Sequence, residues 1–278
     1  MIFPRLIWSS LAVALLVGTV QTGVQSLQAA PIILAAEVYE EQKDQKNQIA
    51  EPSALVAAPA APVQGVAAHT HDDKHDHQHG IAKEWEPANG VERLGWTWMA
   101  NALHAFSMAL LVFAFMGIWR YRRGTVLTAL QLSGFVAAAG WMSFYLWPTL
   151  GLPVTVPGME AAPLQARQLW SVLAVGSAAA ACALAGFGTA KWRWPVAAAL
   201  LALPFVVGAP RLQGDALVGY SPQAHAALEQ LIQQFFWATT WVALSFWISM
   251  GVACGLVFQR WLQPSLMESF NGVRQATV

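Results

Sequence analysis

A run of histidines and aspartates between residues 69 and 79 has the residue types and spacing that could do chemistry. It holds five of the chain's seven histidines, interleaved with three aspartates. Imidazole nitrogen and carboxylate oxygen together suit Co²⁺, Ni²⁺, Zn²⁺ and Cu²⁺, and alternating ligands adapt to several geometries. We therefore expect divalent-metal binding without selectivity; the alternative is a solubilising spacer with incidental metal affinity. The candidate ligands are His69, His71, Asp72, Asp73, His75, Asp76, His77 and His79.

Two glutamates at the outer end of the first apolar stretch are candidates for a metal pathway. Glu37 and Glu40 are three residues apart, so on a helix they share a face and offer hard oxygen ligands. The alternative is an ordinary solvated helix end.

Asn101 and His104 form a second polar pair, also one helical turn apart, inside an apolar stretch. Polar groups at that depth are costly and usually face a bundle interior or a pathway. The alternative is a neutral histidine that is hydrogen-bonded to a neighbouring helix.

The elements that must position these residues are membrane helices. The chain has 278 residues, of which 56% are hydrophobic and 11% charged, whereas about 25% charged is usual for globular domains. No basic patch suggests nucleic acid. No GxSxG, HExxH, CxxC or phosphate-binding glycine loop is present, so the sequence does not indicate an enzyme.

Apolar stretches predict an all-α, polytopic membrane helix bundle with about six transmembrane helices. Pro204 with Gly208 suggests a kinked or broken helix, and Gly251 with Gly255 forms a GxxxG pair for close helix packing. We expect the first stretch to be a retained helix rather than a cleaved signal peptide, because apolar character continues past Pro31. The stretches are residues 7–34, 94–119, 125–148, 168–190, 194–209 and 231–258.

Lysine and arginine placement predicts the orientation of these helices. With six spans and a cytoplasmic N-terminus, every short cytoplasmic turn is basic, and both termini are cytoplasmic. The predicted organisation is a first transmembrane helix (residues 1–36), a disordered periplasmic His-rich linker (37–92), a five-helix membrane bundle (93–261) and a cytoplasmic tail (262–278). The cytoplasmic basic residues are Arg5, Arg120, Arg122, Arg123, Lys191, Arg193, Arg260 and Arg274.

Several stretches resemble the proposed cobalt transporter subunit family CbtA. They are residues 31–40 (PIILAAEVYE), the histidine linker, 90–93 (GVER), 150–170 (LGLPVTVPGMEAAPLQARQLW) and 202–210 (ALPFVVGAP), in the family's order and across nearly the whole chain. In the last stretch the family pattern has a histidine where this chain has Phe205.

The resemblance implies uptake of a divalent transition metal, with cobalt foremost and nickel or zinc as alternatives, as substrate rather than as a permanently bound cofactor. It also implies a small single-span partner similar to CbtB. We expect a multi-pass protein of the bacterial inner membrane whose periplasmic loop captures ions. The alternative is a non-transporting metal-binding accessory or sensor that delivers metal to another component.

Overall fold

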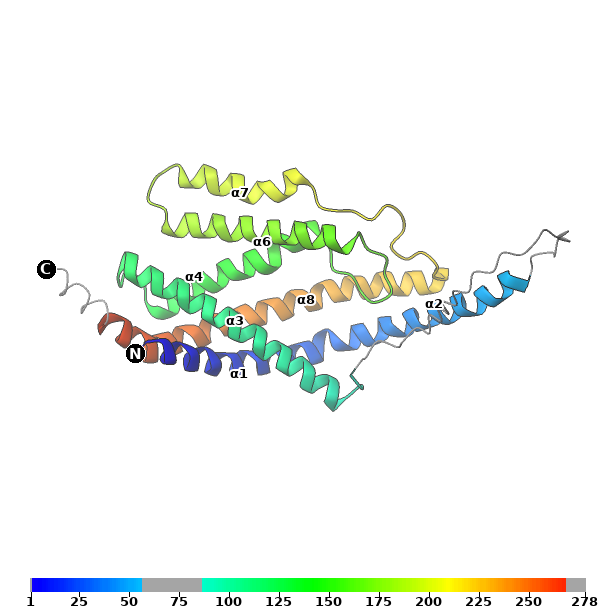
Figure 1. Cartoon of the computed structure of the whole chain (residues 1–278), viewed down its shortest axis with the longest axis horizontal. Coiled ribbons are helices and arrows are strands. Elements are labelled where there is room, and N and C mark those ends of the chain that lie inside the picture. The colour runs from blue at the N-terminus through cyan, green and yellow to red at the C-terminus, as the bar shows by residue number, and fades with distance from the viewer. Residues whose placement is uncertain (1, 57–86, 269–278) are drawn as a thin grey trace, which may run out of the picture.

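The structure is a computed structural model that describes residues 2–56 and 87–268, with side chains for residues 3–46 and 87–268. Within those ranges the chain is helical and contains no strand (Figure 1). The elements are α1 (Ile2–Gln28), α2 (Ala30–Val56), α3 (Val91–Arg123), α4 (Ala129–Trp141), the π-helical turn η1 (Met142–Leu146), α5 (Trp147–Gly151), α6 (Leu164–Phe187), α7 (Arg193–Val207), α8 (Pro222–Val257) and a second π-helical turn η2 (Phe258–Leu262).

The predicted polytopic helix bundle is confirmed. Five helices of the described chain are long and apolar enough to cross a membrane, and α7 is a shorter apolar helix. At 1.5 Å per residue its 15 residues reach about 22 Å, against a hydrocarbon core of about 30 Å. Helix α7 nevertheless runs back beside α6, and the start of α1 lies at the same end of the bundle as η2 (Figure 1).

The main core lies between α1, α3, α4 and α8, where small residues allow close approach. A Cβ at Gly18 of α1 would lie 2.8 Å from the Cα of Ala102 in α3. In α8, a Cβ at Gly251 would meet that of Ala137 at 3.0 Å, and one at Gly255 would meet the Ser133 hydroxyl at 2.5 Å. The predicted GxxxG pair therefore packs against α4. Larger buried side chains of this core are Val13, Val17, Val112, Met116, Leu132, Met250 and Phe258.

Helices α6 and α7 form a hairpin beside this core, held at one end by tryptophans. The indole N–H of Trp147 donates to the carbonyl oxygen of Leu201 (2.9 Å), and that of Trp170 donates to the carbonyl oxygen of Pro204 (2.9 Å). No break occurs at Pro204 itself, because α7 continues to Val207 and ends at Gly208, whose φ is +87°. Two carbonyl oxygens near the proline, those of Leu201 and Pro204, accept from indoles.

Helix α2 corrects the expected disorder of residues 37–56, which are helical up to Val56. Only Ala29 interrupts the run from α1, two residues before Pro31, which cannot donate a hydrogen bond. The segment is rich in Glu, Gln, Lys and Ala, which are strong helix formers. Its first turns also pack against distant loops: Ala36 is fully buried in a second cluster with Val156 and Leu217, and Tyr39 packs on that cluster.

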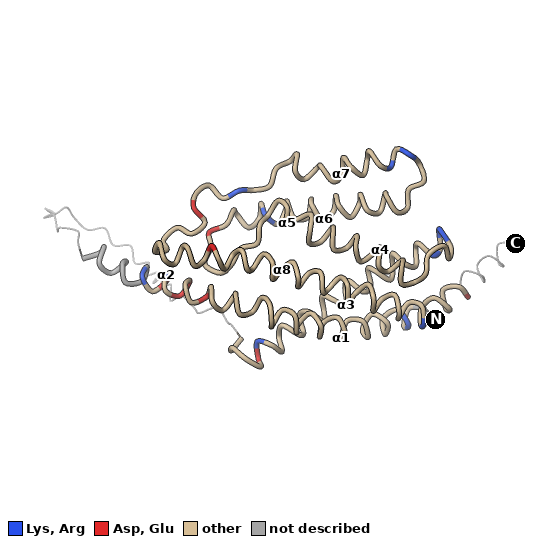
Figure 2. The backbone as a smooth tube through the Cα atoms, turned by 180° about the vertical axis from the view of Figure 1, so that it is seen from behind, with Lys and Arg blue, Asp and Glu red and all other residues tan. Residues whose placement is uncertain are grey.

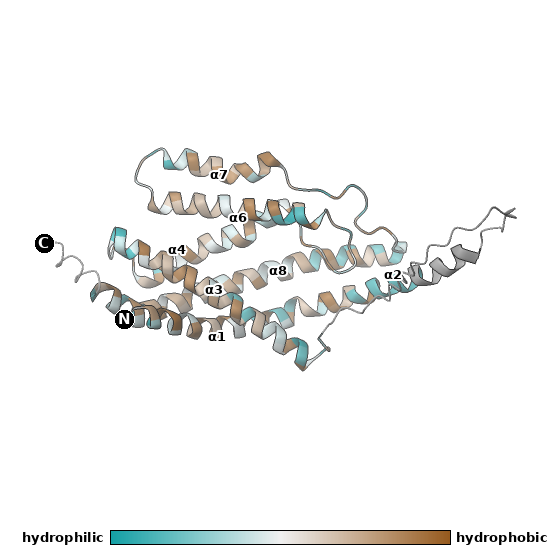
Figure 3. Cartoon of the chain, viewed as in Figure 1, coloured by the Kyte–Doolittle hydropathy of each residue, from teal (hydrophilic) through white to brown (hydrophobic). Residues whose placement is uncertain are grey.

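Acidic residues gather mainly at one end of the bundle, together with some basic ones, and mostly basic residues lie at the other end (Figure 2). We call the end where α2 meets α3 through Glu37 and Arg93 the acidic end, and the end where Arg5 of α1 meets Ser265 the terminal end. Arg5 near the N-terminus contacts the Ser265 hydroxyl at the terminal end. Figure 3 shows hydrophilic residues along α2 and at the helix ends, with hydrophobic residues between them.

Candidate functional site

The histidine run lies outside the described residues, so the structure does not test His69, His71, Asp72, Asp73, His75, Asp76, His77 or His79. Elsewhere in the described ranges, no group of three or more His, Cys, Asp or Glu side chains could hold a metal ion. A candidate site must therefore be built from sparse polar residues, and these gather mainly at the acidic end.

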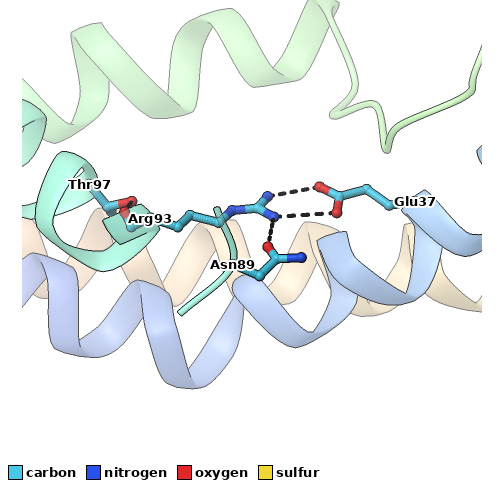
Figure 4. Close-up of polar contacts among 4 residues, drawn as sticks. All are labelled: Glu37, Asn89, Arg93 and Thr97. Atoms are coloured by element: carbon cyan, nitrogen blue, oxygen red, sulfur yellow. Dashed lines mark hydrogen bonds and ion pairs between the residues drawn. The ribbon is translucent and has the colours of Figure 1, made fainter. Parts of the chain in front are cut away.

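Glu37 forms the main polar contact between α2 and the start of α3 (Figure 4). Its Oε1 lies 2.8 Å from Nη2 of Arg93, and its Oε2 lies 3.3 Å from Nη1 of Arg93. The same Nη1 donates to Oδ1 of Asn89 at 2.9 Å. The side chains of Glu37 and Arg93 are 33% and 37% exposed, so the pair is partly screened by solvent. Both carboxylate oxygens of Glu37 are thus occupied by one guanidinium.

Glu40 faces a different neighbour from Glu37. A Cβ at Gly158 would lie 3.1 Å from the Cβ of Glu40 and would collide with the Tyr220 hydroxyl. That hydroxyl donates to the carbonyl oxygen of Gly158 at 3.1 Å. Gly158 has φ +77°, a conformation that favours glycine. The close approach of Glu40 and Tyr220 therefore needs glycine at this position, both for its backbone conformation and for the space that a Cβ would fill. The two glutamates therefore do not converge on one site.

Lys43, one turn beyond Tyr39 on α2, completes the docking of α2 onto the loops. Its Nζ lies 3.7 Å from Oε1 of Glu160 and 4.9 Å from the centroid of the Tyr220 ring. Burial, and then the negative charges of Glu40, Asp44 and Glu160, raise the pKa of Tyr220 above its usual value. The phenol therefore stays protonated and remains a hydrogen-bond donor.

Asn101 joins α3 to α1 within the bundle. Its Nδ2 donates to Thr22 Oγ1 at 3.0 Å and to Gln25 Oε1 at 2.6 Å. Gln21, beside Thr22, is buried, and its carboxamide oxygen has no hydrogen-bond partner in the described structure. Side-chain oxygens of Thr22 and Gln25 thus lie in the interface between α1 and α3.

His104 does not share the contacts of Asn101. Its ring lies 5.1 Å from that of Phe246 in α8, measured between centroids. The side chain is exposed at the surface of the isolated chain, and no hydrogen bond to it is found within the described residues. Asn101 thus forms its hydrogen bonds with α1, whereas His104 packs on α8.

The stretches that carried the family resemblance meet in space. Glu37 of residues 31–40 pairs with Arg93 of residues 90–93, and Glu40 packs on Gly158 of residues 150–170. Phe205 of residues 202–210 lies edge-on to Trp170 of residues 150–170, with 6.1 Å between ring centroids, and also to Trp147, at 5.7 Å. Phe205 therefore has a packing role between two indoles.

Sequence reasoning missed Arg93, Lys43 and Tyr220 as partners of the acidic helix. Sequence analysis named Arg93 only as part of the resembling stretch 90–93, which lies 56 residues from Glu37. No local spacing links residues that distant, so the signal available was their shared membership of resembling stretches.

Comparison with known proteins identifies the same family. A family model described as probable cobalt transporter subunit (CbtA) matches residues 3–259. No curated protein and no solved structure matches the chain.

Proposed function

The chain belongs to the CbtA family of probable cobalt transporter subunits, and from that premise we propose that it takes up divalent transition metal, foremost Co²⁺, across the bacterial inner membrane. It is a multi-pass membrane protein, and the word subunit in the family description implies partner components. A small single-span partner similar to CbtB is the candidate. The metal is cargo, with nickel and zinc as alternatives to cobalt.

The observation that carries the proposal is the pair of Glu37 and Arg93. Glu37 stands where α2, which leads to the histidine segment, joins the bundle, and Arg93 stands just after that segment. A divalent cation and a guanidinium compete for the same two carboxylate oxygens. Glu37 is then the first fixed ligand on the way in, and Arg93 is the internal cation that metal displaces.

The histidine segment captures ions ahead of this point. Val56, where α2 ends, is 19 residues beyond Glu37 in one helix, or about 28 Å at 1.5 Å per residue. Ligands tethered there raise the local metal concentration without forming a selective site. Replacing His69, His71, His75, His77 and His79 together should raise the metal concentration at which uptake is half-maximal. The maximal uptake rate should not change. Loss of the maximal rate would contradict a capture role.

Further inward, the route passes the oxygens of Gln25 and Thr22, which Asn101 now satisfies, and the unsatisfied oxygen of Gln21. Neutral oxygens suit a hard cation that still carries part of its hydration shell. His104 lies about a turn beyond Asn101 on α3 but packs on Phe246 of α8, so it stays a candidate nitrogen ligand beside the contacts of Asn101 rather than among them.

The proposed orientation puts the terminal end in the cytoplasm and the acidic end in the periplasm. Arg120, Arg122 and Arg123 lie in the last turn of α3, Lys191 lies between α6 and α7, and Arg193 begins α7; both connections are at the terminal end. This placement follows the excess of Lys and Arg in short cytoplasmic loops. Val13 and Val17 of α1 are part of the main core, which supports retention of the first helix.

A second candidate function is a metal-binding accessory that passes ions to another transport component. It is favoured by the lack of any three-ligand group within the described helices. Purified protein in liposomes separates the two functions: cobalt flux without a partner supports a transporter, whereas binding without flux supports the accessory.

The primary test is cellular metal content. A strain lacking the protein should accumulate less cobalt at limiting supply, and expression of the intact chain should restore it. Unchanged cobalt in the deletion strain would refute uptake as the function.

A further inference from the structure

An open surface cavity lies at the acidic end, beside the start of α6. Its volume is about 580 Å³, its lining is mostly apolar, and it is bordered by the end of α5, residues 152–155, the first turns of α6 and Phe235 of α8. The polar side chains that line it are Thr149, Thr155, Arg167, Gln168 and Ser171.

Arg167 gives this cavity a positive charge with no counter-charge. No acidic side chain lines the cavity, and no carboxylate of the described residues pairs with Arg167, whereas Arg93 and Lys43 at the same end each have one. Thr149 already donates its hydroxyl to the carbonyl oxygen of Tyr145 at 2.6 Å. The donors that remain come from Arg167, Gln168, Ser171 and Thr155, and together they suit an oxyanion.

The cavity lies at the depth where lipid headgroups are expected. One candidate span ends at Gly151 and the next begins at Leu164, so the cavity sits between two helix ends at the membrane surface. Leu164, Gln168 and Val172 are spaced i, i+4 and i+8 and therefore share one face of α6. Leu164 and Val172 are 66% and 71% exposed, so the lipid-facing side of α6 continues directly from the cavity.

We propose that this cavity binds the phosphate of an anionic phospholipid headgroup. The guanidinium of Arg167 would donate to two phosphate oxygens, an arrangement for which its planar fork is suited. Gln168 and Ser171 would donate to the remaining oxygens, and an acyl chain would lie along Val172. Inorganic phosphate offers the same oxyanion, but only a lipid also covers the apolar face of α6.

The test is a titration of the purified full chain in neutral detergent. Short-chain phosphatidylglycerol, short-chain phosphatidylcholine and inorganic phosphate are added separately, and bound ligand is counted by native mass spectrometry. We expect saturable binding of phosphatidylglycerol that is tighter than that of phosphatidylcholine. Arg167→Gln should weaken it at least about tenfold, or about 1.4 kcal/mol, and Arg167→Lys should weaken it less.

Arg211 provides the matched control, because it is an exposed arginine of the loop at the same end and does not line the cavity. Arg211→Gln should bind phosphatidylglycerol like the wild type. Because no described residue pairs with Arg167, the Arg167→Gln protein should unfold at the wild-type temperature without lipid. Ser171→Ala, which removes one donor, is the second variant if it does not, with a weakening of a few fold.

The outcomes separate lipid from free anion. Saturable binding of inorganic phosphate that is lost in Arg167→Gln and that phosphatidylglycerol does not exceed would retain the oxyanion site but overturn the lipid. Equal binding of phosphatidylglycerol by the wild type and Arg167→Gln would overturn the site itself. Binding of phosphatidylglycerol no tighter than that of phosphatidylcholine would overturn the selection of an anionic lipid.

Discussion

The contact between Glu37 and Arg93 allows its structural and functional roles to be separated by two substitutions. Glu37→Gln removes the carboxylate that would bind metal, whereas Arg93→Gln removes the cation that occupies it. Both substitutions break the same ion pair between α2 and α3. If the pair is purely structural, both substitutions should therefore shift the half-saturating metal concentration in the same direction. If Glu37 binds metal in competition with Arg93, the two substitutions should shift it in opposite directions.

The magnitudes follow from the exposure of the pair. Side chains that are 33% and 37% exposed are screened by solvent, so the pair stabilises the fold by about 1 kcal/mol or less. Metal that binds Glu37 must first displace Arg93 at that cost, and 1 kcal/mol corresponds to about a fivefold change in affinity. Arg93→Gln should thus lower the half-saturating metal concentration by up to about fivefold. Glu37→Gln, which loses a charged ligand, should raise it by about tenfold or more.

The assay is initial cobalt uptake against concentration, in cells or proteoliposomes with equal amounts of each variant. Glu41→Gln is the control, since Glu41 is an exposed carboxylate on the same helix, and it should change neither stability nor uptake. If Glu37→Gln and Arg93→Gln shift the half-saturating cobalt concentration equally and in the same direction, metal does not compete with Arg93 for Glu37. The ion pair would then have only a structural role between α2 and α3.

Two further predictions concern packing at the ends and in the core. Gly18→Ala forces its new methyl against the backbone of Ala102 and should cost about 1–3 kcal/mol, seen as a lower unfolding temperature, whereas Gly23→Ala meets nothing within 4 Å and should not destabilise. Tyr220→Phe removes the hydrogen bond to Gly158 and should cost about 1 kcal/mol below pH 10. Because the folded pKa of Tyr220 is raised, the unfolded chain loses the phenol proton first, and wild-type stability should fall as pH rises above 10. Tyr220→Phe has no phenol to titrate, so fluorescence melts at several pH values should show the unfolding temperatures of the two proteins approaching each other at high pH. A difference in unfolding temperature that does not change with pH would contradict the role given to the Tyr220 phenol.

Helix positions could be predicted where hydropathy decides them. The predicted stretch 94–119 lies within α3, and 231–258 lies almost wholly within α8, because about twenty apolar residues have few alternatives to a membrane helix. Hydropathy does not report local helix geometry. The predicted continuous stretch 125–148 contains the π-helical turn Met142–Leu146, from which Tyr145 reaches Thr240 at 2.6 Å.

The polar half of the structure was less predictable, because long-range contacts decide it. Composition alone indicates disorder after Glu37, yet Lys43 finds Glu160 and Tyr220, which lie more than a hundred residues away. Glu37 was predicted as a candidate from its residue type and its three-residue spacing from Glu40 at a helix end. The partner of Glu37 could not be predicted, because several lysines and arginines of the chain could pair with a helix-end carboxylate. Only the folded structure shows that Arg93 is the one that does.

The position of α1 between α3 and α8 also has a consequence for biogenesis. The first helix meets α3 early, but α8 begins 194 residues after α1 ends. At about 5–20 residues per second, that interval lasts roughly 10–40 s. During this time the part of α1 that packs against α8 faces lipid or the insertion machinery instead of its final partner. The main core is therefore completed last, when Arg5 at the start of the chain reaches Ser265 near its end.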